Sequence, residues 1–256
     1  MNIIHILIFS IVEGITEFLP VSSTFHLILI SKLLGITQND FLKLFEVAIQ
    51  SGAIISVLVL YGRDLWRDRT LLKNIGLSFI PTALVGFVLY KIIKTFFFES
   101  TELMTAAFII MGLVFLMMEG LVAREEIILE KEISRLTVCQ ALLIGLAQAL
   151  AVIPGVSRAG AVMVFMMLLG YKRGEAARYS FLLAVPTILA ASVYDFWKMR
   201  DVVAASSGYS LLLVGWLAAL VFAYLVMRWF LRYLQSHTLL VFGWYRLIAG
   251  IVLILL

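Results

Sequence analysis

Cysteine is almost absent from this chain, and charged residues are scarce. The 256 residues include one cysteine, Cys139, which excludes an intrachain disulfide and a cysteine metal cluster, and we expect it to be an inert buried thiol. Asp, Glu, Lys and Arg make up only 14% of the chain, whereas hydrophobic residues make up 63%. Soluble domains have about 25% charged and about 45–50% apolar residues, so this composition excludes a soluble globular protein.

The chain contains many long apolar segments. Six of them are long enough to cross a bilayer, near residues 44–61, 75–93, 103–122, 179–197, 209–227 and 239–256. Continuous apolar runs indicate an all-α integral membrane protein, because a membrane β-barrel has short alternating segments instead. The N-terminal run has neither a basic leader nor a small-residue cleavage site before Glu13, so we expect mature structure there and not a signal peptide.

Two further apolar segments, 2–34 and 137–170, are interrupted by polar turns. The first turn lies within Glu13-Gly14-Ile15-Thr16-Glu17-Phe18-Leu19-Pro20-Val21-Ser22-Ser23-Thr24-Phe25-His26, and the second lies within Gln148-Ala149-Leu150-Ala151-Val152-Ile153-Pro154-Gly155-Val156-Ser157-Arg158. Neither half of such a segment is a comfortable span by itself. Each segment is therefore predicted to be a re-entrant helix-turn-helix whose turn is buried in protein or lines a wet cavity.

The order of these segments predicts an inverted repeat within one membrane domain, residues 1–256. A re-entrant segment and three spans occupy residues 1–122, and the same order returns in residues 137–256 after a connector, 123–136. An offset of 135 residues aligns Glu13 with Gln148 and Ser22 with Ser157. Because three spans are an odd number, the two halves must have opposite orientations in the membrane.

The basic residues of the loops predict the orientation. Twelve of the 20 Lys and Arg residues lie on one side of this topology, around residues 63–73, 124–135, 172–178 and 228–232, and six lie on the other. The positive-inside rule places the larger set in the cytoplasm. Both termini and the mouth of the first turn then face outward, and the second re-entrant segment enters from the cytoplasm.

The first turn combines carboxylates with hydroxyls. Glu13 and Glu17 are four residues apart and share one helix face. Two such carboxylates at low dielectric either bind a hard divalent metal or take different protonation states, so that one acts as acid or base. Ser22, Ser23 and Thr24 follow Pro20 at a predicted helix N-terminus, which favours anion binding but is also a common plain N-cap.

A histidine and an arginine complete the set of candidate groups. His26 lies one turn after Ser23 and is placed to exchange a proton with a hydroxyl nucleophile, although a packing role is its alternative. In the second turn, Gly155, Ser157 and Arg158 supply a flexible turn, a hydroxyl and a fork-shaped cation suited to phosphate oxygens. The convergence of these groups at one depth favours phosphoryl chemistry over the structural alternative for each group alone.

Two polar features lie outside the turns. Glu46 and Gln50 are one helical turn apart, and they either reach the cavity or form a polar pair in helix packing. Arg246 lies within the last predicted span, where we expect a structural role and a buried acceptor.

The motifs resemble those of a known family. Glu-Gly-x-Thr-Glu-Phe-Leu-Pro-x-Ser-Ser-Thr-x-His-Leu and Pro-Gly-x-Ser-Arg are similar to the two signature motifs of the undecaprenyl-diphosphate phosphatase family, also called bacitracin-resistance proteins. The similarity extends to Phe45-Glu46-x-x-Ile49-Gln50-x-Gly52-Ala53-Ile54 and to Tyr245-Arg246-x-x-x-Gly250. The resemblance implies removal of the terminal phosphate of undecaprenyl diphosphate, which recycles the lipid carrier of bacterial cell-wall synthesis.

The resemblance also implies a role for each site residue. Glu13 and Glu17 become the acidic pair that binds Mg²⁺ or Ca²⁺ or works as acid and base. Ser23 becomes the nucleophile or a phosphate ligand with Ser22 and Thr24 beside it, and His26 becomes its proton partner. Ser157, Arg158 and Gly155 hold the diphosphate. Attack by Ser23 and direct attack by metal-bound water both remain open.

Three positions depart from the family pattern. Phe25 stands where the family usually has glycine, Ala159 where it usually has serine, and Val162 where it often has threonine. The last two changes remove hydroxyls from the second turn. Phe25 either stiffens the first turn or meets the lipid tail.

The implied partners are a polyprenyl diphosphate and membrane lipids, with no nucleic acid and with a homodimer left open. The implied location is the bacterial inner membrane, with the site open to the periplasmic side. A polyprenyl-phosphate transporter or flippase is the alternative, because inverted repeats with broken helices also build alternating-access carriers. Phosphate hydrolysis needs a nucleophile and a proton acceptor, whereas transport needs only binding sites.

Overall fold

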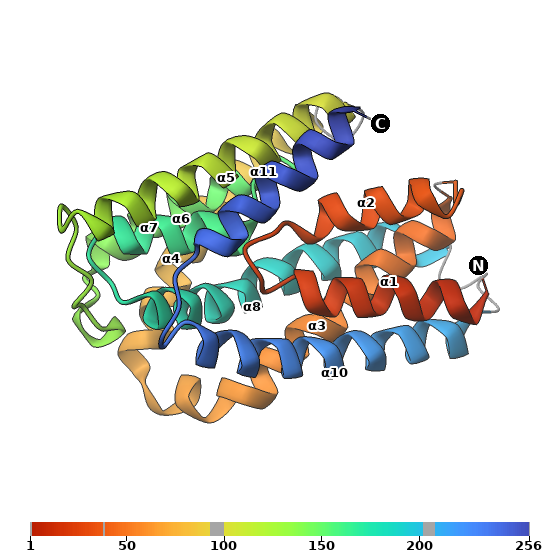
Figure 1. Cartoon of the computed structure of the whole chain (residues 1–256). Helices are drawn as coiled ribbons and strands as arrows, with labels where there is room; N and C mark the ends of the chain where they lie inside the picture. The colour runs from red at the N-terminus through yellow and green to blue at the C-terminus, as the bar shows by residue number, and fades with distance from the viewer. Residues whose placement is uncertain (1, 38, 93–99, 202–207, 256) are drawn as a thin grey trace.

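The computed structural model describes residues 2–37, 39–92, 100–201 and 208–255, and within these ranges the protein is a bundle of helices (Figure 1). In chain order the helices are α1 (Ile3–Thr16), α2 (Ser23–Leu33), α3 (Asp40–Arg67), α4 (Arg69–Ile92), α5 (Thr101–Ala123), η2 (Ile133–Arg135), α6 (Val138–Ala149), η3 (Leu150–Val152), α7 (Arg158–Leu168), α8 (Arg173–Lys198), α10 (Tyr209–Tyr233) and α11 (Leu240–Leu255).

Five helices are long and apolar enough to cross a membrane: α3, α4, α5, α8 and α10. They confirm the five predicted segments from 44–61 to 209–227, so the chain is a multi-pass helical membrane protein. The sixth predicted segment, 239–256, forms α11, which has 16 residues and is shorter than the other five. Residue 93 of the predicted segment 75–93 and residue 256 of the last segment lie outside the described residues.

The two motif segments fold as helix-turn-helix units. α1 and α2 run side by side from the right-hand end of the molecule in Figure 1, and the turn between them lies in its middle. α6 and α7 occupy the left-hand half of the same view. The start of α1 and the end of α11 both lie in the right-hand half of the view.

α2 and α7 are built alike at both ends. Each has 11 residues, and each follows an N-cap serine with positive φ, Ser22 at 66° and Ser157 at 71°. Each is followed by a glycine with positive φ, Gly35 at 62° and Gly170 at 88°. Glycine suits this helix-ending conformation because it has no Cβ. Equivalent residues in these two helices are 135 positions apart, as the sequence offset predicts.

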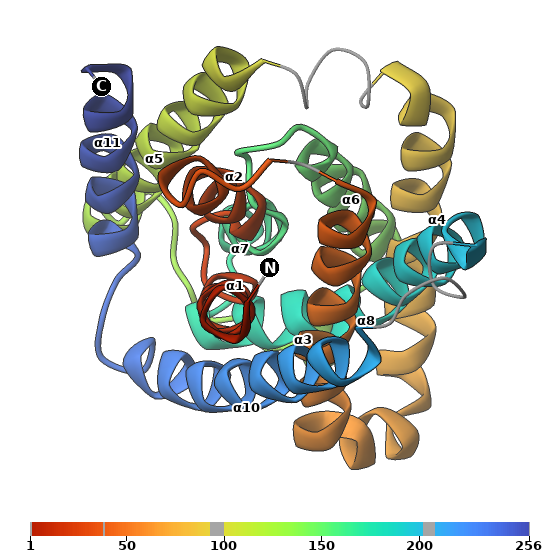
Figure 2. The same cartoon turned by 90° about the vertical axis from the view of Figure 1, so that its right-hand side faces the viewer.

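The helix contacts are arranged in matching pairs. α1 packs against α10, and the corresponding helix of the second half, α6, packs against α4. α3 contacts α8 and α5 contacts α11, so each of these pairs joins a helix to its counterpart in the other half. Viewed along the long axis of the molecule, α1, α2 and α7 lie in the interior and α4, α5, α10 and α11 lie toward the outside (Figure 2). The largest apolar cluster forms around α7 and α8, and this buried centre supports the two turns.

One expectation about a side chain is wrong. Cys139, near the start of α6, is exposed instead of buried. Its position in the first turn of α6 points away from the neighbouring helices.

Candidate active site

The two polar turns meet at one cavity of about 220 Å³. The first turn contributes Glu17, Ser22, Ser23 and Thr24 to its lining, and the second contributes Gly155, Ser157 and Arg158 with the neighbouring Ala151, Ile153 and Pro154. Seven of the nine residues predicted for the site therefore line one cavity. The other two, Glu13 and His26, lie beside it in α1 and α2.

Glu17 connects the hydroxyl of one turn with the cation of the other. The Ser23 hydroxyl donates to Glu17 Oε2 at 2.6 Å, and Arg158 Nη2 donates to Glu17 Oε1 at 3.0 Å. The Arg158 and Glu17 side chains are only 12% and 6% exposed, so water screens this pair little. Arg158 Nη1 also donates to the carbonyl of Ser180 at 2.9 Å, which holds the guanidinium in place.

His26 hydrogen-bonds to Ser22 and Tyr245 and not to the Ser23 hydroxyl. Its Nδ1 lies 2.8 Å from the carbonyl oxygen of Ser22, and its Nε2 lies 2.6 Å from the hydroxyl of Tyr245. The hydrogen bond of the Ser23 hydroxyl thus goes to Glu17 and not to His26. Side chains on a helix lean toward its N-terminus, which brings His26 back over the Ser22 carbonyl at the start of α2.

Glu13 is buried behind Glu17. It is 1% exposed, and among the described residues neither of its carboxylate oxygens has a hydrogen-bond partner. Its electrostatic neighbours are Glu17, Glu46 and Arg158. A buried carboxylate without a donor needs either a proton or a cation, so the donor set fits a hard divalent metal. Within the described ranges, no group of three or more His, Cys, Asp or Glu residues is arranged to hold a metal.

The N-termini of α2 and α7 differ in one respect. Ser157 caps α7, because its Oγ accepts the N–H of Gly160 at 3.2 Å. The Ser22 side chain forms no such cap within the described structure. The N-terminus of α2, whose Ser22, Ser23 and Thr24 line the cavity, therefore has no serine cap, which suits an anionic ligand.

Arg246 was expected to be a structural residue, and the structure shows what it holds. It is fully buried and donates to four main-chain carbonyls: Phe108 at 3.1 Å, Pro20 at 2.8 Å, Gly155, and Val156 at 3.3 Å. Pro20 belongs to the first turn, and Gly155 and Val156 belong to the second. One arginine thus joins both turns from α11; its position within a predicted span and its place in the Tyr245-Arg246 motif both pointed to it, but neither indicated its partners.

The three departures from the family pattern have clear positions. Phe25 is buried and stacks on Phe108 of α5 with ring centroids 3.9 Å apart. Its ring packs between α2 and α5 and is not exposed, which favours a packing role over contact with the lipid tail. Ala159 and Val162 are fully buried in α7, and neither belongs to the cavity lining.

Four cavity residues come from outside the turns: Gln50 of α3, and Thr187, Ile188 and Ala191 of α8. Thr187 accepts a hydrogen bond from Gln148 at 3.0 Å. Gln50 was a candidate from its spacing with Glu46. No signal in the sequence pointed to Thr187, because α8 reads as an ordinary apolar span.

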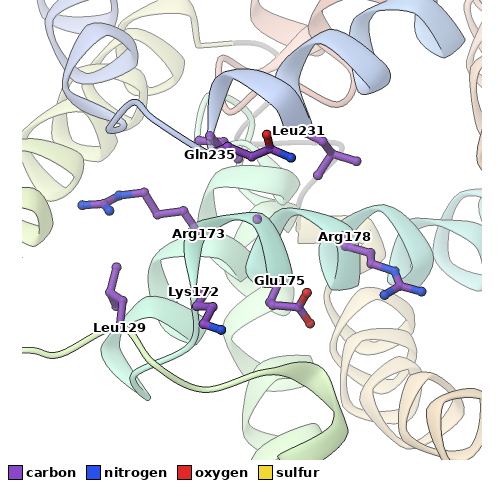
Figure 3. Close-up of a pocket in the computed structure, with 9 residues that line it drawn as sticks. Leu129, Lys172, Arg173, Glu175, Arg178, Leu231 and Gln235 are labelled. Carbon is purple, nitrogen blue, oxygen red and sulfur yellow. The ribbon is translucent and has the colours of Figure 1, made fainter.

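A larger cavity, of about 450 Å³, lies near the start of α8 and the end of α10 (Figure 3). Its cations already have partners: Lys172 pairs with Glu132, Arg173 with Glu119, and Arg178 with Asp64. Because these ion pairs occupy its charged groups, we assign the chemistry to the smaller cavity between the turns.

Fold and site together define a multi-pass helical membrane protein with two polar turns that share one cavity. The chain belongs to the family described as bacitracin resistance protein BacA, which matches residues 6–252. It is 50% identical over 198 residues to an undecaprenyl-diphosphatase of Persephonella marina, with 77% of each chain covered. It is 45% identical over 217 residues to one of Wolinella succinogenes, covering 85% of this chain and 83% of the relative. An undecaprenyl-diphosphatase of Methanococcus aeolicus is 38% identical over 255 residues, covering 100% and 98%.

Proposed function

We propose that this chain hydrolyses undecaprenyl diphosphate to undecaprenyl phosphate and phosphate, as the names of its relatives state for them. The observation that carries the proposal is the chain of contacts from Ser23 through Glu17 to Arg158, which unites a nucleophile, a proton acceptor and a phosphate-binding cation in one cavity. A carrier needs no hydroxyl paired with a proton acceptor, so this pair favours hydrolysis over lipid transport.

The mechanism starts with Ser23. Its Oγ attacks the terminal phosphorus while its proton passes to Glu17 Oε2, and the bond from that phosphorus to the bridging oxygen breaks. The lipid leaves as undecaprenyl phosphate, which keeps the bridging oxygen. Water then attacks the phosphorus of the phosphoserine, the bond from that phosphorus to Ser23 Oγ breaks, and the proton held by Glu17 returns to Oγ as phosphate leaves with the protons of the water. Arg158 and the first-turn N–H groups of α2 neutralise the phosphate oxygens.

Glu13, Ser157 and Gly155 complete the proposed site. Glu13 and Glu17 are the residues that would hold a Mg²⁺ or Ca²⁺ ion, which supplies positive charge to the diphosphate when bound. Ser157 stays on α7 as its cap, while Gly155 provides the tight turn that brings Arg158 to the cavity.

We further propose a topology of six spans and two re-entrant segments, with inverted repeats at 1–122 and 137–256. The matching ends of α2 and α7 and the matching helix pairs support it. The start of α1 and the end of α11 in the same half of the molecule, together with the loop charges, support termini outside, in the periplasm, and a site open to that side of the inner membrane.

Purified protein tests the function directly. Wild type in detergent should release phosphate from undecaprenyl diphosphate with Mg²⁺ or Ca²⁺ present, and absence of release refutes the proposal. Ser23→Ala and Glu17→Gln should each lower kcat by about 100-fold or more. If Ser23→Ala keeps full activity, the attack is made by water and the enzyme assignment survives.

A further inference from the structure

The imidazole of His26 is held at both ring nitrogens. Nδ1 faces the Ser22 carbonyl at 2.8 Å, and because a carbonyl only accepts, Nδ1 must carry the proton. In a neutral ring Nε2 is then an acceptor, and the Tyr245 hydroxyl at 2.6 Å donates to it. The proton positions follow from the partners of the ring.

Aromatic rings enclose the imidazole. The Tyr245 ring lies nearly parallel to it, with centroids 5.8 Å apart and 9° between the planes. Phe25 and Phe108 meet it at steep angles, 72° and 69°. These contacts limit how far the ring can turn toward the Ser23 hydroxyl.

The acceptor of the His26 proton is a strained residue. Ser22 has φ 66° and ψ 94°, which a residue with a Cβ rarely adopts, and its side chain makes no cap to α2. Its carbonyl accepts from the main-chain N–H of His26 at 3.4 Å as well as from the ring. Such a conformation persists only where the surroundings hold it.

The adjacent residues Tyr245 and Arg246 of α11 hold this turn at two points. Arg246 donates to the carbonyl of Pro20 at 2.8 Å, two residues before Ser22. Tyr245 acts on Ser22 through His26. The C-terminal helix therefore supports the turn that presents Ser23 to the cavity, although its residues lie more than 200 positions away in the chain.

We propose that His26 is a positioning residue that Tyr245 orients, and that it maintains the Ser22 turn instead of taking the proton of Ser23. Tyr245 thereby becomes part of the functional site. The proposal deepens the proposed hydrolysis and rests on it for its effect on rate. When the turn relaxes, Ser23 and the N–H groups of α2 move out of line with the phosphorus, and a displacement of about 1 Å lowers rates by about 100-fold.

Amide variants of His26 separate the two roles. The amide N–H of asparagine replaces Nδ1–H, whereas that of glutamine lies near Nε2. His26→Asn should keep kcat within about 10-fold of wild type, while His26→Gln and His26→Ala should lose about 100-fold. Equal losses in Asn and Gln would show that the Nδ1–H bond is not what His26 contributes, and a pH profile of kcat/KM that loses a limb in His26→Asn would show that His26 exchanges protons; either result would overturn the proposal.

A double-mutant cycle tests the part played by Tyr245. Tyr245→Phe should lower kcat by about 3- to 10-fold in the wild-type background and have no further effect in His26→Asn, because residues that act through one contact are not additive. Additive losses refute the coupling. Tyr224→Phe is the matched control, because it removes another tyrosine hydroxyl, on α10 outside the cavity, and should leave kcat unchanged.

Nitrogen-15 NMR of histidine-labelled protein tests the geometry without any activity. The chain has three histidines, so His5→Gln and His237→Gln variants identify the His26 signals. The neutral ring should carry its proton on Nδ1, and Tyr245→Phe should shift Nε2 alone. A proton on Nε2 overturns the proposal. If wild type releases no phosphate but shows the expected Nδ1–H form, the hydrolysis is refuted, while the positioning of His26 by Tyr245 and Ser22 is not.

Discussion

Replacing Arg246 tests whether the two turns must be joined for the site to work. Arg246→Met keeps most of the side-chain volume and removes the donors to Pro20, Gly155 and Val156. We expect kcat/KM for undecaprenyl diphosphate to fall by about 100-fold, because Ser23 and Arg158 sit on different turns and a shift of about 1 Å between them is enough for that loss.

The expected effect on stability is much smaller, because two contributions oppose each other. Leaving three turn carbonyls without a donor costs about 1–3 kcal/mol each. Removing a fully buried guanidinium, whose acceptors are neutral carbonyls, returns several kcal/mol of desolvation energy. The free energy of unfolding should therefore change by only about 0–4 kcal/mol.

Phosphate release and thermal unfolding of the same detergent-solubilised sample separate these effects. Arg246→Lys gives an intermediate case, with a kcat/KM about 10-fold below wild type, because an ammonium lacks the planar fork that spans both turns. Arg228→Met on the exposed face of α10 is the matched control and should match wild type in both assays. A folded Arg246→Met or Arg246→Lys protein that keeps wild-type kcat/KM would refute the reasoning.

Three other substitutions have definite expected outcomes. Gly155→Ala should lower both kcat and the unfolding temperature, because φ is +98° there and a Cβ would overlap a main-chain carbonyl of α5. Wild-type values of both quantities would contradict this prediction. Phe25→Gly should lower the free energy of unfolding by about 3 kcal/mol or more, measured by thermal unfolding, because it removes a buried ring stacked on Phe108, whereas Phe25→Leu should lose less. Glu119→Gln breaks the ion pair with Arg173 and should lower the free energy of unfolding by about 3 kcal/mol. This value is near the low end for a buried ion pair because the Arg173 side chain is 19% exposed. A change below about 1 kcal/mol in the same assay would mean that the pair contributes no more than a surface ion pair.

The sequence by itself determined the membrane class, five of the long helices, both helix-turn-helix units and the family. These follow from local composition and from motifs a few residues long, because apolar run length sets which helices can span and proline with serine sets where they break. The shared face of Glu13 and Glu17 followed from helical spacing alone. The offset of 135 residues was also readable, and it reappears in the positive φ of Ser22 and Ser157.

Only the tertiary structure decided which groups act on one another. Spacing along α2 paired Ser23 with His26, whereas the fold pairs Ser23 with Glu17 and His26 with Tyr245, 219 residues away. The contact of Glu17 with Arg158 joins residues 141 positions apart. Such partners depend on how α1, α2, α7 and α11 pack, and on a positive φ at a serine that no local preference favours. For that reason the sequence was sufficient to identify the candidate side chains, whereas the packing of the helices decides which of them contact one another.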